Sequence, residues 1–307
     1  MGDVLIKVSA FVVIIVAGYY AGHAGKLGKG TGTTLSKIVF NFTLPCAVVN
    51  AFGQAQFSRD MLWLIVVGIA FTFGSYFVMF AVVRRCERMD RIFYLCNIAG
   101  YNIGCFALPF VQAFFPASQA VAACLFDAGN AFMMSGGGYA LTSVLVSDER
   151  LEHPLRLVVR RMFSSAAVDT YLVLIVMALL GVAVPEPVIK FTQPMANANA
   201  FLAMFMLGLM MNLDVDRAKL AKAARLLGMR GVFNVAFTVL ALFVLPFSPA
   251  VRIVLTMLIW APMGAMGPVF TMWCKADHGL AGFANAVTII VAIVAMSLIV
   301  MVTGGAA

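Results

Sequence analysis

The chain has 307 residues, of which 63% are hydrophobic and only 11% are charged, and its mean hydropathy is +1.00. A chain of this composition cannot bury its apolar side chains inside one water-soluble domain, so it is expected to be an integral membrane protein. The net charge of +8 does not indicate a nucleic-acid partner, because the basic residues lie in short runs between hydrophobic segments.

Ten apolar segments follow one another along the chain, each close to the roughly 20 residues that a helix needs to cross a bilayer. The sequence therefore predicts an all-α membrane protein with ten transmembrane helices. Their predicted limits are 4–22, 33–53, 61–83, 92–115, 118–146, 163–183, 188–212, 229–247, 250–273 and 280–303.

Basic residues alternate between the connections. Most follow the odd-numbered spans, Arg230 among them, whereas only Lys7, Arg59, Lys190 and Arg252 fall on the other side. Because cytoplasmic loops retain Lys and Arg, both termini are predicted on the non-cytoplasmic side of the cell membrane.

The second and seventh spans contain a repeat. Residues 42–52 read FTLPCAVVNAF and residues 191–201 read FTQPMANANAF, and seven of the eleven positions are identical. Five spans separate the copies, so the second enters the membrane from the opposite side. This pattern predicts a 5+5 inverted repeat, with residues 1–147 and 148–307 as its halves. The matched Asn50 and Asn199 either line a translocation path or form hydrogen bonds across a helix interface.

Two spans carry helix-breaking residues near their centres: GYNIGCFALP at 100–109 in the fourth, and WAPMGAMGP at 260–268 in the ninth. Each is interpreted as a broken helix, and two that cross would direct the positive ends of half-helices at a site for an anion. The alternative is a simple proline kink with glycines for packing. The substrate-binding candidates are Tyr101, Asn102, Ile103, Gly104, Pro109, Ala261, Pro262, Met263 and Gly264, together with Asn50 and Asn199.

Asp127 and Asn130 lie one helical turn apart in the fifth span, on one face of the helix. An ionisable group within a span is functional by default, because burying its charge unpaired costs at least about 2.5 kcal/mol. We interpret both residues as substrate-binding and Asp127 as the proton-coupling group. The alternative is a structural carboxyl that supports the broken fourth helix.

Three segments resemble motifs of the auxin efflux carrier family. NIGCFALP (102–109) resembles its N-x-G-F-x-G-x-P segment, SKIVFNFTLPCAVV (36–49) its K-x-V-x-N-x-x-L-P signature, and Ala261–Pro262 its ninth-span A-P. The resemblance implies a fold shared with bile-acid/sodium symporters and sodium/proton antiporters. It also implies a scaffold of spans 1, 2, 6 and 7 that often mediates dimerisation, and a moving transport domain of spans 3–5 and 8–10.

The expected function is secondary active transport of a small organic anion, a malonate-like or auxin-like carboxylate, by elevator-type alternating access. Efflux coupled to protons or driven by the membrane potential is expected, with lipid and a second copy of the chain as partners. The six cysteines form no CxxC pair, and no metal, cofactor or enzymatic activity is expected. The alternatives are an anion channel and a membrane-embedded ligand sensor.

Overall fold

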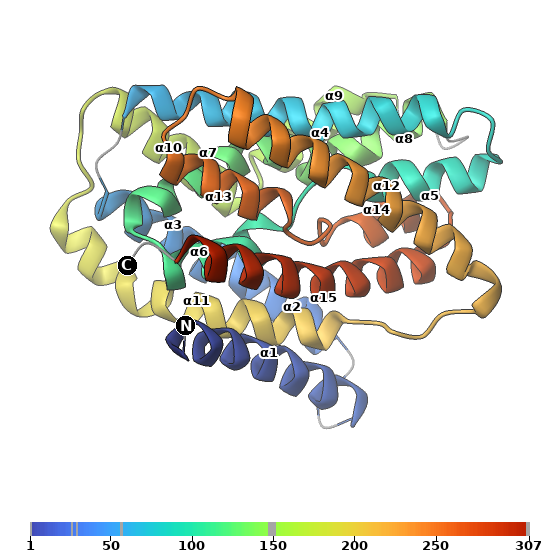
Figure 1. Ribbon diagram of the computed structural model, residues 1–307, viewed down its shortest axis with the longest axis horizontal. Coiled ribbons are helices and arrows are strands. Elements are labelled where there is room, and N and C mark those ends of the chain that lie inside the picture. The colour runs from blue at the N-terminus through green and yellow to red at the C-terminus, as the bar shows by residue number, and fades with distance from the viewer. Residues whose placement is uncertain (1, 26, 29, 56–57, 147–151, 305–307) are drawn as a thin grey trace.

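The computed structural model describes residues 2–25, 27–28, 30–55, 58–146 and 152–304, and every regular element within them is a helix (Figure 1). Five helical segments are long and apolar enough to cross a membrane, and the bent pair α9–α10, with 74° between its members, would make a sixth. The structure therefore supports a multi-pass membrane protein.

The elements follow the chain with short connections. They are α1 (Gly2–His23), α2 (Thr31–Ile38), η1 (Val39–Thr43), α3 (Leu44–Gly53), η2 (Arg59–Leu62), α4 (Trp63–Val82), α5 (Arg88–Ile98), η3 (Ile103–Ala107), α6 (Leu108–Phe114), α7 (Ala117–Phe132), η4 (Met133–Gly137), α8 (Gly138–Leu145), α9 (Pro154–Met162), α10 (Ala166–Leu179), α11 (Glu186–Met210), η5 (Arg217–Lys219), α12 (Leu220–Val239), η6 (Leu240–Val244), α13 (Pro249–Ile259), α14 (Gly267–Trp273) and α15 (His278–Thr303).

One predicted boundary is wrong, and one span with correctly predicted limits is interrupted. The helical segment expected at 229–247 begins at Arg217, so Arg230 lies inside α12 and is buried, whereas the charge count had placed it in a cytoplasmic loop. The segment expected at 118–146 is divided between α7, η4 and α8, because Gly136 adopts a φ of +128° inside it. A basic residue beside a hydrophobic segment does not reveal by itself whether the helix has already begun.

Glycines allow helices to approach closely at two interfaces. α1 and α11 lie side by side along one edge of the molecule (Figure 1), and a Cβ on Gly208 would overlap the carbonyl oxygen of Ile15. At the contact between α4 and α7, a Cβ on Gly129 would overlap the carbonyl oxygen of Ile65. Such small-residue contacts are typical of helices that pack within a membrane.

The two copies of the repeated segment are in contact with each other, because α3 packs on α11. The Thr43 hydroxyl donates to Asn199 Oδ1 at 2.9 Å, and Asn50 Nδ2 donates to the Thr192 hydroxyl at 2.8 Å. Since Thr43 matches Thr192 and Asn50 matches Asn199 in the repeat, the two hydrogen bonds are reciprocal. Both asparagines therefore make the cross-helix bonds that were one of the two alternatives.

The helix breaks occur where the glycines and prolines predicted them. α5 ends at Ile98 before η3 begins at Ile103, and α13 ends at Ile259 before α14 begins at Gly267. The two extended segments cross and pair: Tyr101 and Met263 form an isolated antiparallel bridge, and the Asn102 backbone N–H donates to the Pro262 carbonyl at 2.9 Å.

Pro109 lies beyond this break rather than in it, at the start of α6. The π-helical turn η3 precedes it, as η1 precedes Pro45 at the start of α3. A π-turn adds a residue where a proline ring would clash with the preceding turn of an α-helix. The helix therefore continues through Pro109, and the unwound segment is confined to 99–102.

Candidate functional site

A cavity of about 280 Å³ lies beside the crossing of the two interrupted helices. Its wall combines the crossing segment, the fifth predicted span and residues near the start of α10. It is lined by Phe40, Leu44, Tyr101, Asn102, Ile103, Gly104, Asp127, Asn130, Ala131, Met134, Ser135, Arg161, Ser165, Ala167, Val168, Tyr171, Ala265 and Met266.

Asn130 holds the interrupted backbone in place. Its Oδ1 accepts the Tyr101 backbone N–H at 2.9 Å, and its Nδ2 donates to the Tyr101 carbonyl at 2.8 Å. The same Nδ2 also donates to Asp127 Oδ1 at 2.8 Å, so both of its hydrogens are already engaged. Asn130 thus satisfies the peptide groups of Tyr101 that the helix break leaves without intrahelical partners.

Asp127 places its carboxylate on the cavity wall. Oδ1 accepts from Asn130, one turn away as expected, and Oδ2 accepts from the Tyr171 hydroxyl at 2.7 Å. A Cβ on Gly104 would lie 3.5 Å from Oδ2, so the carboxylate is beside the first turn of η3. A helix N-terminus stabilises negative charge, whether it belongs to this carboxylate or to a bound anion.

Asn102 is a buried residue of the cavity wall with an unpartnered donor. It is 5% exposed and its backbone is fixed by the bond to Pro262, yet its Nδ2 has no hydrogen-bond partner within the described part of the chain. Buried side-chain amides almost always have partners. An unpartnered amide that lines a cavity beside a helix N-terminus is suited to donate to an anion.

Arg230 is a central residue that the sequence analysis missed. It is 4% exposed, and its guanidinium donates to two carbonyl oxygens at the C-terminal end of α5. These are Ile98, the last residue of the helix, at 3.0 Å, and Gly100, just beyond it, at 3.3 Å. It also donates to the carbonyl oxygens of Ala261 at 3.2 Å and Pro262 at 3.3 Å, beyond the end of α13. One cation therefore stabilises the negative ends of both interrupted helices.

The Arg230 guanidinium also lies over the Tyr101 ring, 4.7 Å from its centroid. Within the residues described, no carboxylate forms an ion pair with it. Its positive charge is consequently offset by carbonyl dipoles and a ring face alone, so the crossing keeps a net positive charge that favours an anion nearby.

A second arginine lies on the cavity wall. Arg161 of α9 stacks over the Trp273 ring at 4.0 Å from its centroid and lines the cavity with Ser135 and Ser165. The sequence analysis counted Arg161 only as a loop charge, because it precedes the apolar run of the sixth span. The fold brings it to the same cavity as Asp127.

The other predicted site residues are distributed differently. Ile103 and Gly104 line the cavity, whereas Pro262 and Met263 support it by pairing with the opposite segment. Neither Ala261 nor Gly264 lines it; a Cβ on Gly264 would meet the end of the Met134 side chain, which packs against this glycine.

Three more predicted residues lie elsewhere. Asn50 and Pro109 line a second cavity, and Asn199 is fully buried at the contact between α3 and α11. Across the described ranges, no cluster of three or more His, Cys, Asp or Glu side chains is arranged to hold a metal ion.

Comparison with known families gives one match. Residues 3–153 match the model of a family described as membrane transport protein. These residues include the 36–49 and 102–109 motifs, Asp127 and Asn130. A search of curated proteins finds no match.

Proposed function

We propose that the protein is a secondary active transporter of a small organic anion. Residues 3–153 match the membrane transport protein family, which includes the auxin efflux carriers. This is a family of transporters rather than enzymes. The observation that carries the proposal is the unpartnered Asn102 amide on a cavity beside the buried Arg230. A carboxylate there would accept from the amide within a positive potential.

The proposed mechanism is elevator-type alternating access by ten spans arranged as a 5+5 inverted repeat. The reciprocal Thr43–Asn199 and Asn50–Thr192 bonds support an inverted repeat, because matched residues exchange partners across a pseudo-two-fold axis. Five predicted spans are absent from the five apolar segments, and each has a physical reason. The fourth and ninth are interrupted, the fifth is divided at Gly136, the sixth is the bent pair α9–α10, and the seventh contains amides and prolines.

The proposed scaffold consists of spans 1, 2, 6 and 7, and the transport domain of spans 3–5 and 8–10. Contacts of α11 with α1 and α3, and of α10 with α3, support the scaffold, whereas α4 packs on α7 in the transport domain. On this division, the Tyr171–Asp127 hydrogen bond joins the two. It would break whenever the transport domain moves.

Proton coupling follows from the charges at the site. A carboxylate substrate and an ionised Asp127 would repel each other, whereas protonation of Asp127 leaves Arg230 and Arg161 to attract the anion. Proton and anion would therefore favour each other's binding and cross together.

Two further features are proposed from the sequence. Both termini face the non-cytoplasmic side, so a cytoplasmic signal from a reporter fused at either end would contradict the topology. The chain forms a homodimer through the outward faces of the second and seventh predicted spans, where the matched Phe42 of η1 and Phe191 of α11 are 60% and 74% exposed. A mass of two chains in lipid is expected, and a mass of one chain would contradict the dimer.

Carboxylates should stabilise the purified protein against heat. Acetate, malonate, succinate and indole-3-acetate are the test acids, and their uncharged amides are the controls. A ligand at a hundred times its Kd contributes about 2.7 kcal/mol to the free energy of unfolding, which raises Tm measurably. Equal stabilisation by acids and amides, or none by either, would contradict a site selective for anions.

Asp127→Asn should bind the acid but lose the pH dependence of binding and transport. In the wild type, affinity is expected to fall as pH rises and Asp127 ionises, over a range in which the acid itself remains ionised. The neutral amide should keep the low-pH affinity throughout, because its Oδ1 can still accept from Asn130 while its Nδ2 donates to the Tyr171 hydroxyl oxygen. If Asp127 is a structural carboxyl instead, the variant will lower Tm and leave the pH profile unchanged.

A further inference from the structure

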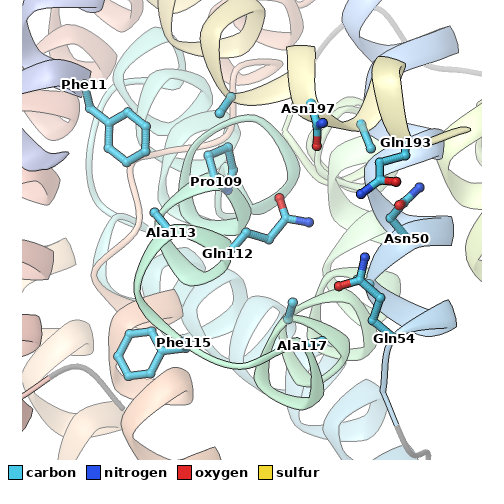
Figure 2. Close-up of a pocket in the computed structure, with 14 residues that line it drawn as sticks. Phe11, Asn50, Gln54, Pro109, Gln112, Ala113, Phe115, Ala117, Gln193 and Asn197 are labelled. Carbon is cyan, nitrogen blue, oxygen red and sulfur yellow. The ribbon is translucent and has the colours of Figure 1, made fainter. Parts of the chain in front are cut away.

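A second cavity, of about 370 Å³, lies further along the same half-helix that borders the Asp127 cavity. Its distinguishing feature is a group of five carboxamide side chains from three elements, which Figure 2 shows around a common space. They are Asn50 and Gln54 at the end of α3, Gln112 in α6, and Gln193 and Asn197 in α11. None of its lining residues is charged. We call this the amide cavity.

The five amide side chains differ in whether they form hydrogen bonds within the protein. Asn50 Nδ2 donates to Thr192, and Gln112 Nε2 donates to the Ala47 carbonyl at 3.4 Å. The side chains of Gln54, Gln193 and Asn197 form no hydrogen bond with any described residue. Three carboxamides thus retain their donors for a ligand.

The ends of helices at the amide cavity favour an anion over a cation. α7, a helix of 16 residues, begins at Ala117, and both Ala117 and Ala120 in its first turn line the cavity. The positive end of its dipole therefore lies at the wall. Phe11 and Phe115 supply an apolar side against which a short carbon skeleton can pack.

We propose that the amide cavity is a second binding position for the transported carboxylate, reached from the opposite face of the membrane to the Asp127 cavity. This inference rests on the proposed transport function. Neutral amides would hold the acid more weakly than a site with Arg161 on its wall and the buried Arg230 beside it, which suits a position from which substrate leaves.

A closed segment separates the two positions. Leu44 of α3 and Gly104 of η3 border the Asp127 cavity, whereas Asn50 of α3 and Pro109 of α6, which continues η3, border the amide cavity. Between them along the chain, Ala47 and Ala107 are fully buried, and the Gln112 bond to Ala47 ties α6 to α3. Substrate could pass only if η3–α6 moves relative to α3, as the elevator mechanism requires.

The test replaces two amides whose loss should not affect the fold, Gln193→Leu and Asn197→Leu, separately and together. Uptake of acetate, malonate, succinate and indole-3-acetate is measured in membrane vesicles of both orientations. The control is Asn212→Leu, an exposed asparagine at the end of the seventh predicted span that lines neither cavity and accepts the Asp214 backbone N–H. Tm should be unchanged in the single variants, which checks folding.

For the best-transported acid, the double variant should raise the half-saturating concentration about tenfold when the acid is supplied on the membrane face nearer the amide cavity. When the acid is supplied on the opposite face, nearer the Asp127 cavity and its Arg161, the increase should be less than twofold. An equal change from both faces, or none, would overturn the second position while leaving the transport function intact. An altered sodium dependence with unchanged acid saturation would also overturn it, by identifying a cation site. Wild-type vesicles that move none of the acids would contradict the proposed function, and the inference with it.

Discussion

Arg230→Met should cause the largest loss of stability of any single change near the crossing. The side chain of Arg230 donates to carbonyl oxygens of both interrupted helices and is almost fully buried. Methionine fills much of the same volume but leaves the carbonyls of Ile98, Gly100 and Ala261 without this donor, whereas Pro262 keeps the Asn102 N–H. Each buried unsatisfied group costs about 1–3 kcal/mol. We expect a loss of about 3–5 kcal/mol in the free energy of unfolding, comparable to breaking a buried ion pair. The measurement is Tm in detergent, together with the yield of folded protein.

Arg230→Lys separates charge from geometry. Lysine keeps the positive charge but presents one compact ammonium in place of a planar group with five donors, so it cannot reach all four carbonyls. It should recover part of the lost stability and part of the affinity for anions. If Arg230→Met melts at the wild-type temperature and still binds acids, Arg230 does not stabilise the helix ends.

Asn102→Ala should weaken acid binding without disturbing the fold. The Asn102 side-chain amide has an unpartnered Nδ2, so the folded chain loses no hydrogen bond from that donor when the side chain is removed. A hydrogen bond to a charged group contributes roughly 1.5–3 kcal/mol, which corresponds to about tenfold or more in Kd. The comparison is the Kd of the most stabilising acid and the Tm of the ligand-free protein.

Asn130→Ala is the matched control, because Asn130 lines the same cavity with its amide fully engaged. Its loss should lower Tm, since both peptide groups of Tyr101 lose their partner. The account predicts opposite patterns: reduced affinity with normal Tm for Asn102→Ala, and reduced Tm for Asn130→Ala. A normal Kd in Asn102→Ala would remove Asn102 from the site.

The sequence predicted the helix breaks because their cause is local. Gly100 adopts a φ of +91°, which a residue with a side chain rarely tolerates, and Pro262 cannot donate to a helix. The Asp127–Asn130 pair was equally accessible, since one helical turn places both on one face. The sequence did not predict that the break ends before Pro109, because a π-turn depends on how the whole helix is packed.

The sequence could not reveal residues that reach the site through the fold. Arg230 lies five residues after Arg225 in a basic stretch, so a count of charges assigns both to a loop, yet only Arg230 meets the ends of α5 and α13. Tyr171 is one aromatic residue in an apolar run, and only the packing of α10 near α7 brings its hydroxyl to Asp127. Such contacts join positions 31 or more residues apart and leave no local pattern.

Counterflow is the most direct test of the central claim, that the crossing moves a small carboxylate by alternating access. Proteoliposomes are loaded with unlabelled acid, the best stabiliser among the four, and diluted into a trace of the labelled form. A carrier should accumulate label transiently inside, saturate with external acid, and lose this exchange in Asn102→Ala. A channel equilibrates the label without accumulation, and a sensor moves none. Absence of transient accumulation in wild-type vesicles that contain folded protein would contradict the account.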